Sequence, residues 1–381
     1  MEETSTYGRR AARLLAFAVG GGVALTLALA SSASADDVVV QEAEVVNAGA
    51  AVANSGGNVA VGNASENDAE TNQDAVGAVA VNTAETSNHS DGTAVIETGD
   101  ATATGNESAT SVAQHADTGG DGGGADVVVQ DAEVTNVGAA AANSGGNIAV
   151  GNVSDNDAET NQGAVGAVAV NVAATSNHSD GTAKIHTGDA TATGNRSLTG
   201  IAQHADTGGG GGLDVVVQDA DVLNAGLAFA NSGGNIAVGN LSDNDAETNQ
   251  GAFGLLAFNV AGTTNHSDGH ASITTGNATA TGNESVTGIV QSADTGCDDG
   301  LNVVLQSAGV VNVGLAFANS GFNVALGNLS SQSSVVNQGA FGLIAANLAS
   351  SSNTSGGTAW IHTGAAWAAG NRSATFIGQH A

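Results

Sequence analysis

Apolar and polar residues alternate with a period of two along most of this chain. From Gln130 to Ala142 every second residue is apolar, small or an amide, whereas Asp131 and Glu133 occupy intervening positions. The alternation continues over 148–160, where the acidic residues again fall in one set. Strict alternation predicts half-buried β-strands, and the content of Gly, Asn, Thr and Val disfavours helix. We therefore predict an all-β protein.

The inward set of this alternation consists of small residues: Ala, Val, Ile, Ser, Thr, Asn, Gln and Gly. Such side chains cannot fill a wide sandwich, but they suit a narrow β-solenoid in which identical residues stack from rung to rung and amides hydrogen-bond along the stack. One alternative is a disordered chain, which low aromatic content and high charge favour. Another is four separate small β-domains. The regular alternation and 41% hydrophobic residues favour the solenoid.

The chain also repeats itself with a period of 88 or 89 residues. The segment DVVVQ begins at Asp37, Asp126 and Asp214, and a degenerate copy, NVVLQ, begins at Asn302. Glycine-rich joints separate the units, and self-similarity of this kind is typical of solenoids and arrays. We assign repeats one to four to residues 36–125, 126–213, 214–301 and 302–381.

Each repeat contains an internal echo. The pattern S/T-G-x-x-x-A-x-G-N-x-S occurs twice in every repeat, with its asparagines 43 residues apart. The asparagines are Asn63 and Asn106, Asn152 and Asn195, Asn240 and Asn283, and Asn328 and Asn371. We therefore expect half-repeats of about 44 residues. Two rungs of about 22 residues in each would give about sixteen rungs and a rod of roughly 75 Å, and one longer coil is the alternative.

The composition narrows the function classes. The 381 residues include no proline, 56 glycines, 3% aromatic residues, and 6 basic against 37 acidic residues, for a net charge of −31. This charge excludes a basic nucleic-acid binder, and the single cysteine excludes a disulfide scaffold. Proline removes a ladder hydrogen bond, so its absence fits a chain that is paired strand almost throughout. No nucleophile elbow, phosphate loop or zinc motif appears, and we do not expect an enzyme.

The first 35 residues have the features of a bacterial export signal. Arg9, Arg10 and Arg13 precede an apolar run over 14–30, and Ala33-Ser34-Ala35 provides small residues for cleavage. A transmembrane anchor is the alternative, but the run is short and three glycines interrupt it. We expect a mature chain that begins at Asp36, has no membrane span, and is secreted or attached to the cell surface.

The inward ladders also resemble those of known bacterial proteins. Gln130, Asn136 and Ala140 recur in the next repeat as Gln218, Asn224 and Ala228. With these columns the chain resembles bacterial β-solenoid repeat proteins and is loosely similar to curlin-type repeats. The resemblance implies stacked strands with inward Gln, Asn, Ser and Ala, and it makes a functional-amyloid-like fibre subunit one alternative. It implies no site residue.

An acidic cluster is the first candidate for chemistry. In repeats one to three, three carboxylates alternate along a predicted strand and therefore share an outward face. They are Glu66, Asp68 and Glu70; Asp155, Asp157 and Glu159; and Asp243, Asp245 and Glu247. Dense carboxylate oxygens are suitable calcium ligands, so calcium is the one cofactor that we consider, and a calcium-dependent surface binding module is an alternative function. The competing interpretation is a solvated face that keeps the rod soluble.

Two further motifs recur in repeats one to three. The segment Asn-His-Ser-Asp-Gly at 88–92, 177–181 and 265–269 could be a transition-metal site, but Asp-Gly is a hairpin dipeptide, so we predict a turn. The pairs Thr102/Thr104, Thr191/Thr193 and Thr279/Thr281 resemble the arrays of ice-binding proteins, but one pair per 88 residues is too sparse for a continuous face. Ice binding is therefore a minor alternative. Cys297, in a joint, is available for pairing between chains or is incidental.

Repeat four differs from the others. It contains no Asp or Glu from Leu301 onward, and it is rich in aromatic residues. It is either a terminal cap or a docking end that attaches to the cell envelope or to another copy. The docking residues would be Phe317, Phe322, Phe341, Trp360, Trp367 and Phe376. We expect a non-catalytic protein with a structural or adhesive role at the bacterial surface.

Overall fold

The computed structural model is all-β, as the alternation predicts. It describes residues 28–32, 38–118, 125–208, 213–296 and 301–381, and these contain strands and short connections but no helix. The strands, in chain order, are β1 (Ala28–Ser32), β2 (Val38–Asn54), β3 (Val59–Glu97), β4 (Ala101–Asp117), β5 (Ala125–Asn143), β6 (Ile148–His186), β7 (Ala190–Asp206), β8 (Leu213–Asn231), β9 (Ile236–Phe253), β10 (Leu256–Thr274), β11 (Ala278–Asp294), β12 (Leu301–Asn319), β13 (Val324–Phe341), β14 (Ile344–Ser355), β15 (Thr358–His362) and β16 (Ala366–His380).

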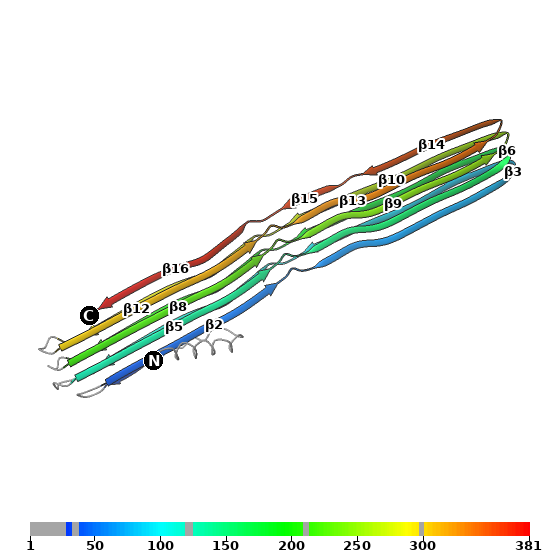
Figure 1. Cartoon of the computed structure of the whole chain (residues 1–381). Helices are drawn as coiled ribbons and strands as arrows, with labels where there is room; N and C mark the ends of the chain where they lie inside the picture. Colours follow the sequence, from blue (N-terminus) through cyan, green and yellow to red (C-terminus); the bar gives the residue numbers. More distant parts are fainter. Residues whose placement is uncertain (1–27, 33–37, 119–124, 209–212, 297–300) are drawn as a thin grey trace, which may run out of the picture.

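The strands form parallel sheets in which neighbours come from successive sequence repeats. Within the described residues, one sheet has the order β12-β8-β5-β2, and a second has the order β1-β4-β7-β11-β16. The third has the order β13-β9-β6-β10-β14, with β15 on β10 and β3 on β6. Figure 1 shows these long strands running side by side along an elongated body.

The pairing register runs from one repeat to the next. Gln41 pairs with Gln130, Gln130 with Gln218, and Gln218 with Gln306, so partners are 89 or 88 residues apart. The prediction of rungs of about 22 residues is therefore wrong. The long axis follows the strands: a leg such as 38–76, at about 3.3 Å per residue, spans about 130 Å. Alternation through these segments is almost unbroken, so the backbone meets no corner at which a short rung could turn.

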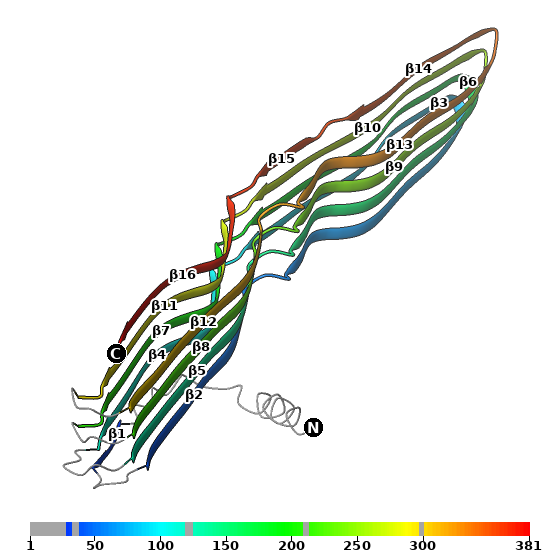
Figure 2. The ribbon, with the colours of Figure 1, turned by 60° about the vertical axis from the view of Figure 1, so that its left-hand side comes forward.

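In every repeat the chain reverses direction at the same end of the body, within β3 and β6 in the first two repeats. In β3 the chain reverses near Gly77, so that Thr86 Oγ1 donates to Thr71 Oγ1 at 2.8 Å. In the third and fourth repeats the same reversal separates β9 from β10 and β13 from β14. Figure 2 shows the outgoing and returning legs as two facing layers. Inward side chains of one layer therefore contact those of the other.

A short break interrupts both layers midway along the body. Residues 55–58 and 98–100 lie between strands, and the Ser55 hydroxyl donates to the carbonyl of Gly99 at 2.6 Å. Gly57 has a φ of 79°, a left-handed conformation that glycine adopts without strain. The two echoed motifs of a repeat begin at these breaks, so the sequence echo places one break in each layer at the same level.

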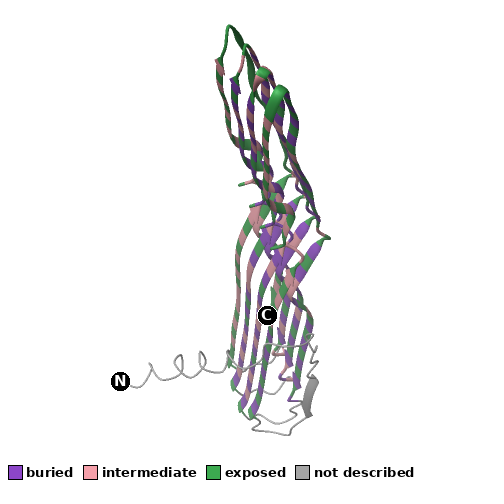
Figure 3. Ribbon diagram, turned by 90° about the vertical axis from the view of Figure 1, so that its right-hand side faces the viewer, coloured by how far each residue is buried: buried purple, intermediate pink, exposed green. Residues whose placement is uncertain are grey.

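The core between the layers is narrow and built from small residues. Alanine columns, with a few Val and Ile, form the apolar clusters, and Ala140, Ala192 and Ala228 are almost fully buried in one of them. Buried amide columns separate these clusters; Asn136 and Gln130 are both fully buried. Figure 3 shows buried and exposed residues alternating along the strands. The predicted ladders of small and amide residues are therefore present.

Glycine is required where the two layers approach most closely. A Cβ added at Gly49 would overlap the carbonyl of Gly105, and one added at Gly92 would overlap the carbonyl of Gly151. Gly92 belongs to the Asn-His-Ser-Asp-Gly segment, which lies inside β3. The prediction of a turn at this segment is therefore wrong, because the glycine makes room for the opposite layer instead of reversing the chain.

Several predicted features lie partly or wholly outside the described residues. Residues 1–27 and 33–35 of the predicted signal region are among them, and so are residues 36–37 at the predicted start of the mature chain and Cys297. Within that region, β1 pairs in parallel with β4, placing Ala28 opposite Ala113. Export and cleavage remain predictions. The described residues include no helix with the length and hydrophobicity that a membrane span requires.

Candidate functional site

The nine acidic residues singled out in the sequence form a grid on one outer face. Asp68 of β3 pairs with Asp157 of β6, and Asp157 pairs with Asp245 of β9. The flanking carboxylates form matching columns on either side, and the side chains point outward. The columns are Glu66, Asp155 and Asp243; Asp68, Asp157 and Asp245; and Glu70, Glu159 and Glu247.

The centre of this grid is electrostatically unfavourable. Partial burial, followed by the nearby carboxylates, raises the pKa of Asp157 above its ordinary value of 3.8; the contributing neighbours are Asp245, Asp68, Glu159 and Asp155. Both causes disfavour the ionised form, because the carboxylate loses water and meets like charges. The grid therefore attracts protons or cations.

The grid does not gather its carboxylates into a chelating cluster. Among the described residues, the group of side chains placed to share a metal ion is His178, Asp180 and His266, which includes none of the nine. Calcium binding at the grid stays a prediction. A melting curve of the mature chain with and without calcium tests it, because organised binding would raise the midpoint.

The six aromatic residues proposed for docking are exposed, but they do not form one patch. Phe317 lies on β12 and stacks on Phe229 with ring centroids 5.0 Å apart, whereas Phe341 lies at the reversal end and stacks on Phe253 at 5.3 Å. The others lie at the midway break (Phe322) and on the returning leg (Trp360, Trp367 and Phe376). Repeat four is therefore not organised around a single aromatic site.

The feature that repeat four does present is an open sheet edge. Strands β12, β13, β14 and β16 each end their sheet in the described structure, with a partner from repeat three on one side. At the opposite side, β2 and β3 end their sheets, and β1 covers part of β4. An open edge presents unpaired N–H and C=O groups that can pair with another chain.

The buried asparagine columns have a direction. Asn47 Nδ2 donates to Asn136 Oδ1 at 2.8 Å, Asn136 donates to Asn224, and Asn224 donates to Asn312. The columns that begin at Asn63, Asn82 and Asn106 donate the same way, from repeat one toward repeat four. One end of each column is therefore an acceptor and the other a donor.

A surface column of alternating charge runs in parallel with these ladders. Arg196 lies between Glu107 and Glu284, with its Nη1 3.8 Å from Glu107 Oε1 and its Nε 3.3 Å from Glu284 Oε2. Arg372 follows in register with Glu284. This column was not predicted from the sequence, although the sequence contains its signal: the variable residue of the second G-N-x-S motif is Glu, Arg, Glu and Arg in repeats one to four.

The two minor motifs also align between repeats. The Thr-x-Thr pairs of repeats one to three stack in register, but Thr193 and Thr281 are buried, so only one threonine of each of these two pairs is available to solvent. The histidines of the 88–92 segment and its copies stack with ring centroids 4.8 Å apart. None of the protein-family models, curated proteins or solved structures compared with the chain matches it.

Proposed function

We propose that the mature chain is an exported, non-catalytic structural protein of the bacterial surface that assembles by edge-to-edge stacking of its sheets. In this proposal the four repeats are four coils of a flattened β-solenoid, and each half-repeat contributes half a coil. The repeat-four edge of one copy stacks on the repeat-one edge of the next. The polarity of the buried asparagine columns carries the proposal.

The asparagine columns supply complementary ends. If the pattern of donation continues, Asn312 of one copy donates to Asn47 of the next, as Asn224 donates to Asn312 within the chain. Gln306 donates to Gln218, and Gln130 donates to Gln41, so the glutamine columns run in the opposite direction. Both kinds of column are complementary only head to tail, which favours parallel, in-register stacking of copies.

Charge supports the same arrangement. The alternating column begins with Glu107 and ends with Arg372, so stacking places an arginine beside a glutamate at the junction. The acidic grid is interrupted in repeat four, where Ser331 and Ser333 follow Asp243 and Asp245. Stacking would therefore bring neutral residues, and not a fourth row of carboxylates, against the acidic first repeat.

The repeat-four edge also lacks the features that protect an edge. Natural sheets discourage pairing with lysine, proline or inward charges. From 301 to 381 the chain has no Lys, Pro, Asp or Glu. In the precursor, β1 lies along part of β4. Cleavage after Ala35 would remove β1 and leave the repeat-one edge open, so we expect assembly to follow export.

The test restores the acidic columns in repeat four. In the mature chain, Ser331→Asp, Ser333→Asp and Val335→Glu place carboxylates at positions that already carry them in repeats two and three. We expect the wild type to form elongated stacks in sedimentation and electron microscopy. We expect the triple variant to stay monomeric at low salt and to recover assembly at high salt, because ions screen exposed charges over about 3 Å at 1 M.

A matched control adds the same charge elsewhere on repeat four. Ser352→Asp, Thr354→Asp and Thr358→Asp would face neutral or histidine positions of the next copy, and this variant should assemble much more readily than the acid-column variant. A wild type that is monomeric at every concentration would overturn the proposal, as would an acid-column variant that assembles like the wild type. Deleting 301–381 should abolish assembly while the remaining repeats stay folded.

A further inference from the structure

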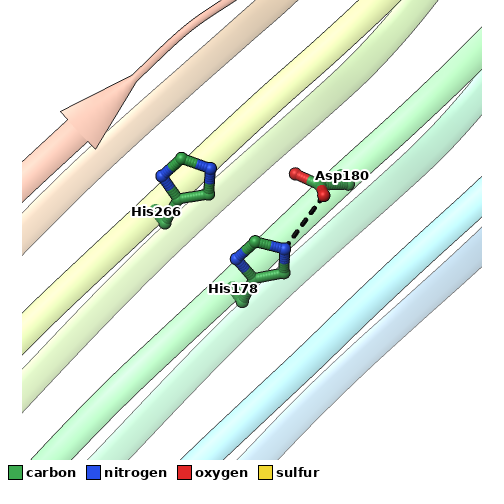
Figure 4. A group of neighbouring side chains, drawn as sticks. All are labelled: His178, Asp180 and His266. Carbon is green, nitrogen blue, oxygen red and sulfur yellow. Dashed lines mark hydrogen bonds and ion pairs between the residues drawn. The ribbon is translucent and has the colours of Figure 1, made fainter.

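The histidine segments of repeats two and three bring three metal-binding side chains together. His178 and Asp180 are two residues apart on β6 and therefore point to the same side of the strand. His266 of β10 is paired in register with His178, and the two rings stack with centroids 4.8 Å apart. Figure 4 shows the rings side by side on neighbouring strands, with the carboxylate facing His178.

The distances suit a shared ion. His178 Nε2 lies 2.9 Å from Asp180 Oδ2, and one ligand atom from each of His178, Asp180 and His266 lies within 4.8 Å of the others. Zinc ligands sit about 2.0–2.1 Å from the metal, so in a tetrahedral site they are about 3.4 Å apart. Small side-chain rotations would bring the set to that spacing, since the backbone register already aligns the two strands.

The surroundings favour a ligand here. Asp180 Oδ1 is buried and has no hydrogen-bond partner in the described structure, which leaves an oxygen with unused acceptor capacity. The His178 and Asp180 side chains remain 38% and 39% exposed, so an ion and its water can enter from solvent. The carboxylates Asp91 and Asp268, which flank Asp180 in register, add negative charge.

We propose that His178, Asp180 and His266 form a zinc-type site that links repeats two and three. Two imidazole nitrogens and one carboxylate oxygen, with water as the fourth ligand, are a donor set suited to zinc and neighbouring first-row divalent ions. Calcium is disfavoured because it requires six to eight oxygen ligands. Binding requires a deprotonated Nε2 on His178: in a neutral ring the proton then sits on Nδ1, and an imidazolium ring would release one proton to solvent.

The role of such a site follows from its position. The ligands come from two adjacent strands whose sequence separation is 88 residues, so a bound ion would cross-link successive repeats. Binding to the folded state alone raises its stability by mass action. Repeat four has Thr354 where His266 stands, and Gly356 where Asp268 stands, so the histidine column stops at repeat three.

Cobalt(II) titration of the metal-stripped mature chain tests the proposal. Cobalt reports four-coordinate binding through visible absorption, and zinc should then displace it. We expect one equivalent at this site and a melting midpoint that rises with zinc. Two variants each remove a ligand: Asp180→Asn, and His266→Thr, which introduces the residue of repeat four. Loss of a hydrogen bond that supports a ligand weakens metal binding about 10–100-fold, so loss of the ligand itself should weaken it more.

The matched control is His204→Thr. His204 also stacks on a histidine of the neighbouring repeat, with centroids 5.0 Å from His115, but it does not belong to the ligand cluster. This variant should bind cobalt like the wild type, and circular dichroism should show that all variants are folded. Absence of cobalt absorption in the folded wild type would overturn the proposal, as would equal binding by the wild type and His266→Thr. Stack formation is measured separately on the metal-stripped chain, so that a failure to bind metal is distinguished from a failure to assemble.

Discussion

At the scale of single residues, stability depends on side chains that are polar and buried at once. Gln130 is fully buried, and its Nε2 donates both to Gln41 Oε1 at 2.8 Å and to the carbonyl of His204 at 3.0 Å. A buried amide that loses its partner costs about 1–3 kcal/mol, so each rung requires the next one in register. The sequence predicts the inward Asn and Gln columns. It does not predict the hydrogen-bond partner in the opposite layer, which for Gln130 is the carbonyl of His204.

Phe322 is a residue under backbone strain. It has a φ of 57° at the position where the other repeats place Gly57, Gly146 and Gly234, and its side chain is 88% exposed. A left-handed conformation costs a residue with a Cβ about 1–2 kcal/mol. We therefore predict that Phe322→Gly stabilises the chain by about 0.5–1 kcal/mol, after the greater entropy of unfolded glycine is subtracted. Chemical denaturation measures the difference.

Phe376→Gly is the control for this prediction. Phe376 is also exposed, but it lies within β16 and has no positive φ. Glycine there should destabilise the chain, because it weakens a strand. If both substitutions lowered stability equally, strain at Phe322 would be disproved.

At the scale of the strands, glycine decides how close the two layers come. Gly138 of β5 faces Gly194 of β7, and an added Cβ would overlap the Gly194 carbonyl. The Asp-Gly pair of the histidine segment serves the same purpose in β3. A sequence pattern cannot distinguish this use of glycine from a turn, because both require a missing Cβ, and only the opposite layer shows which one applies.

The contrast between two glycines tests this interpretation. Gly138→Ala should lower the free energy of unfolding by about 1–3 kcal/mol or more, because backbone must move to admit the methyl group. Gly200→Ala on β7 should be neutral or slightly stabilising, because nothing lies within 4 Å of the added Cβ. Equal effects of the two substitutions in urea denaturation would contradict the close-approach argument.

At the scale of the whole molecule, stacking in register places many like charges in columns. Besides Asp157, burial and like charges raise the pKa values of Asp214 and Asp221. For these groups the folded state binds more protons than the unfolded chain between the ordinary value of 3.8 and the raised pKa. At neutral pH these carboxylates therefore lower the free energy of unfolding. This unfavourable effect shrinks as the pH falls through the raised pKa values, and it stops changing below 3.8.

Asp157→Asn should remove much of this pH dependence. We predict that the variant is more stable than the wild type at pH 7, and that the difference shrinks as the pH falls from neutral through the raised pKa of the wild-type carboxyl. Denaturation midpoints across this range measure the effect. Glu85→Gln removes an exposed carboxylate whose register neighbour is Ala174, so it should give a smaller change. A larger change from Glu85→Gln would refute the account.

The sequence alone determined the strand content, the small inward residues, the 88-residue repeat and the outward acidic face, because alternation and repetition can be read along the chain. Tertiary structure decided the length of a rung, the meeting of His178 with His266, and the Glu107–Arg196–Glu284 column. These depend on which distant segment lies next to a given strand. The neighbouring strand is not the segment 22 or 44 residues away. It is the segment 88 or 89 residues away, where equivalent residues of successive repeats pair.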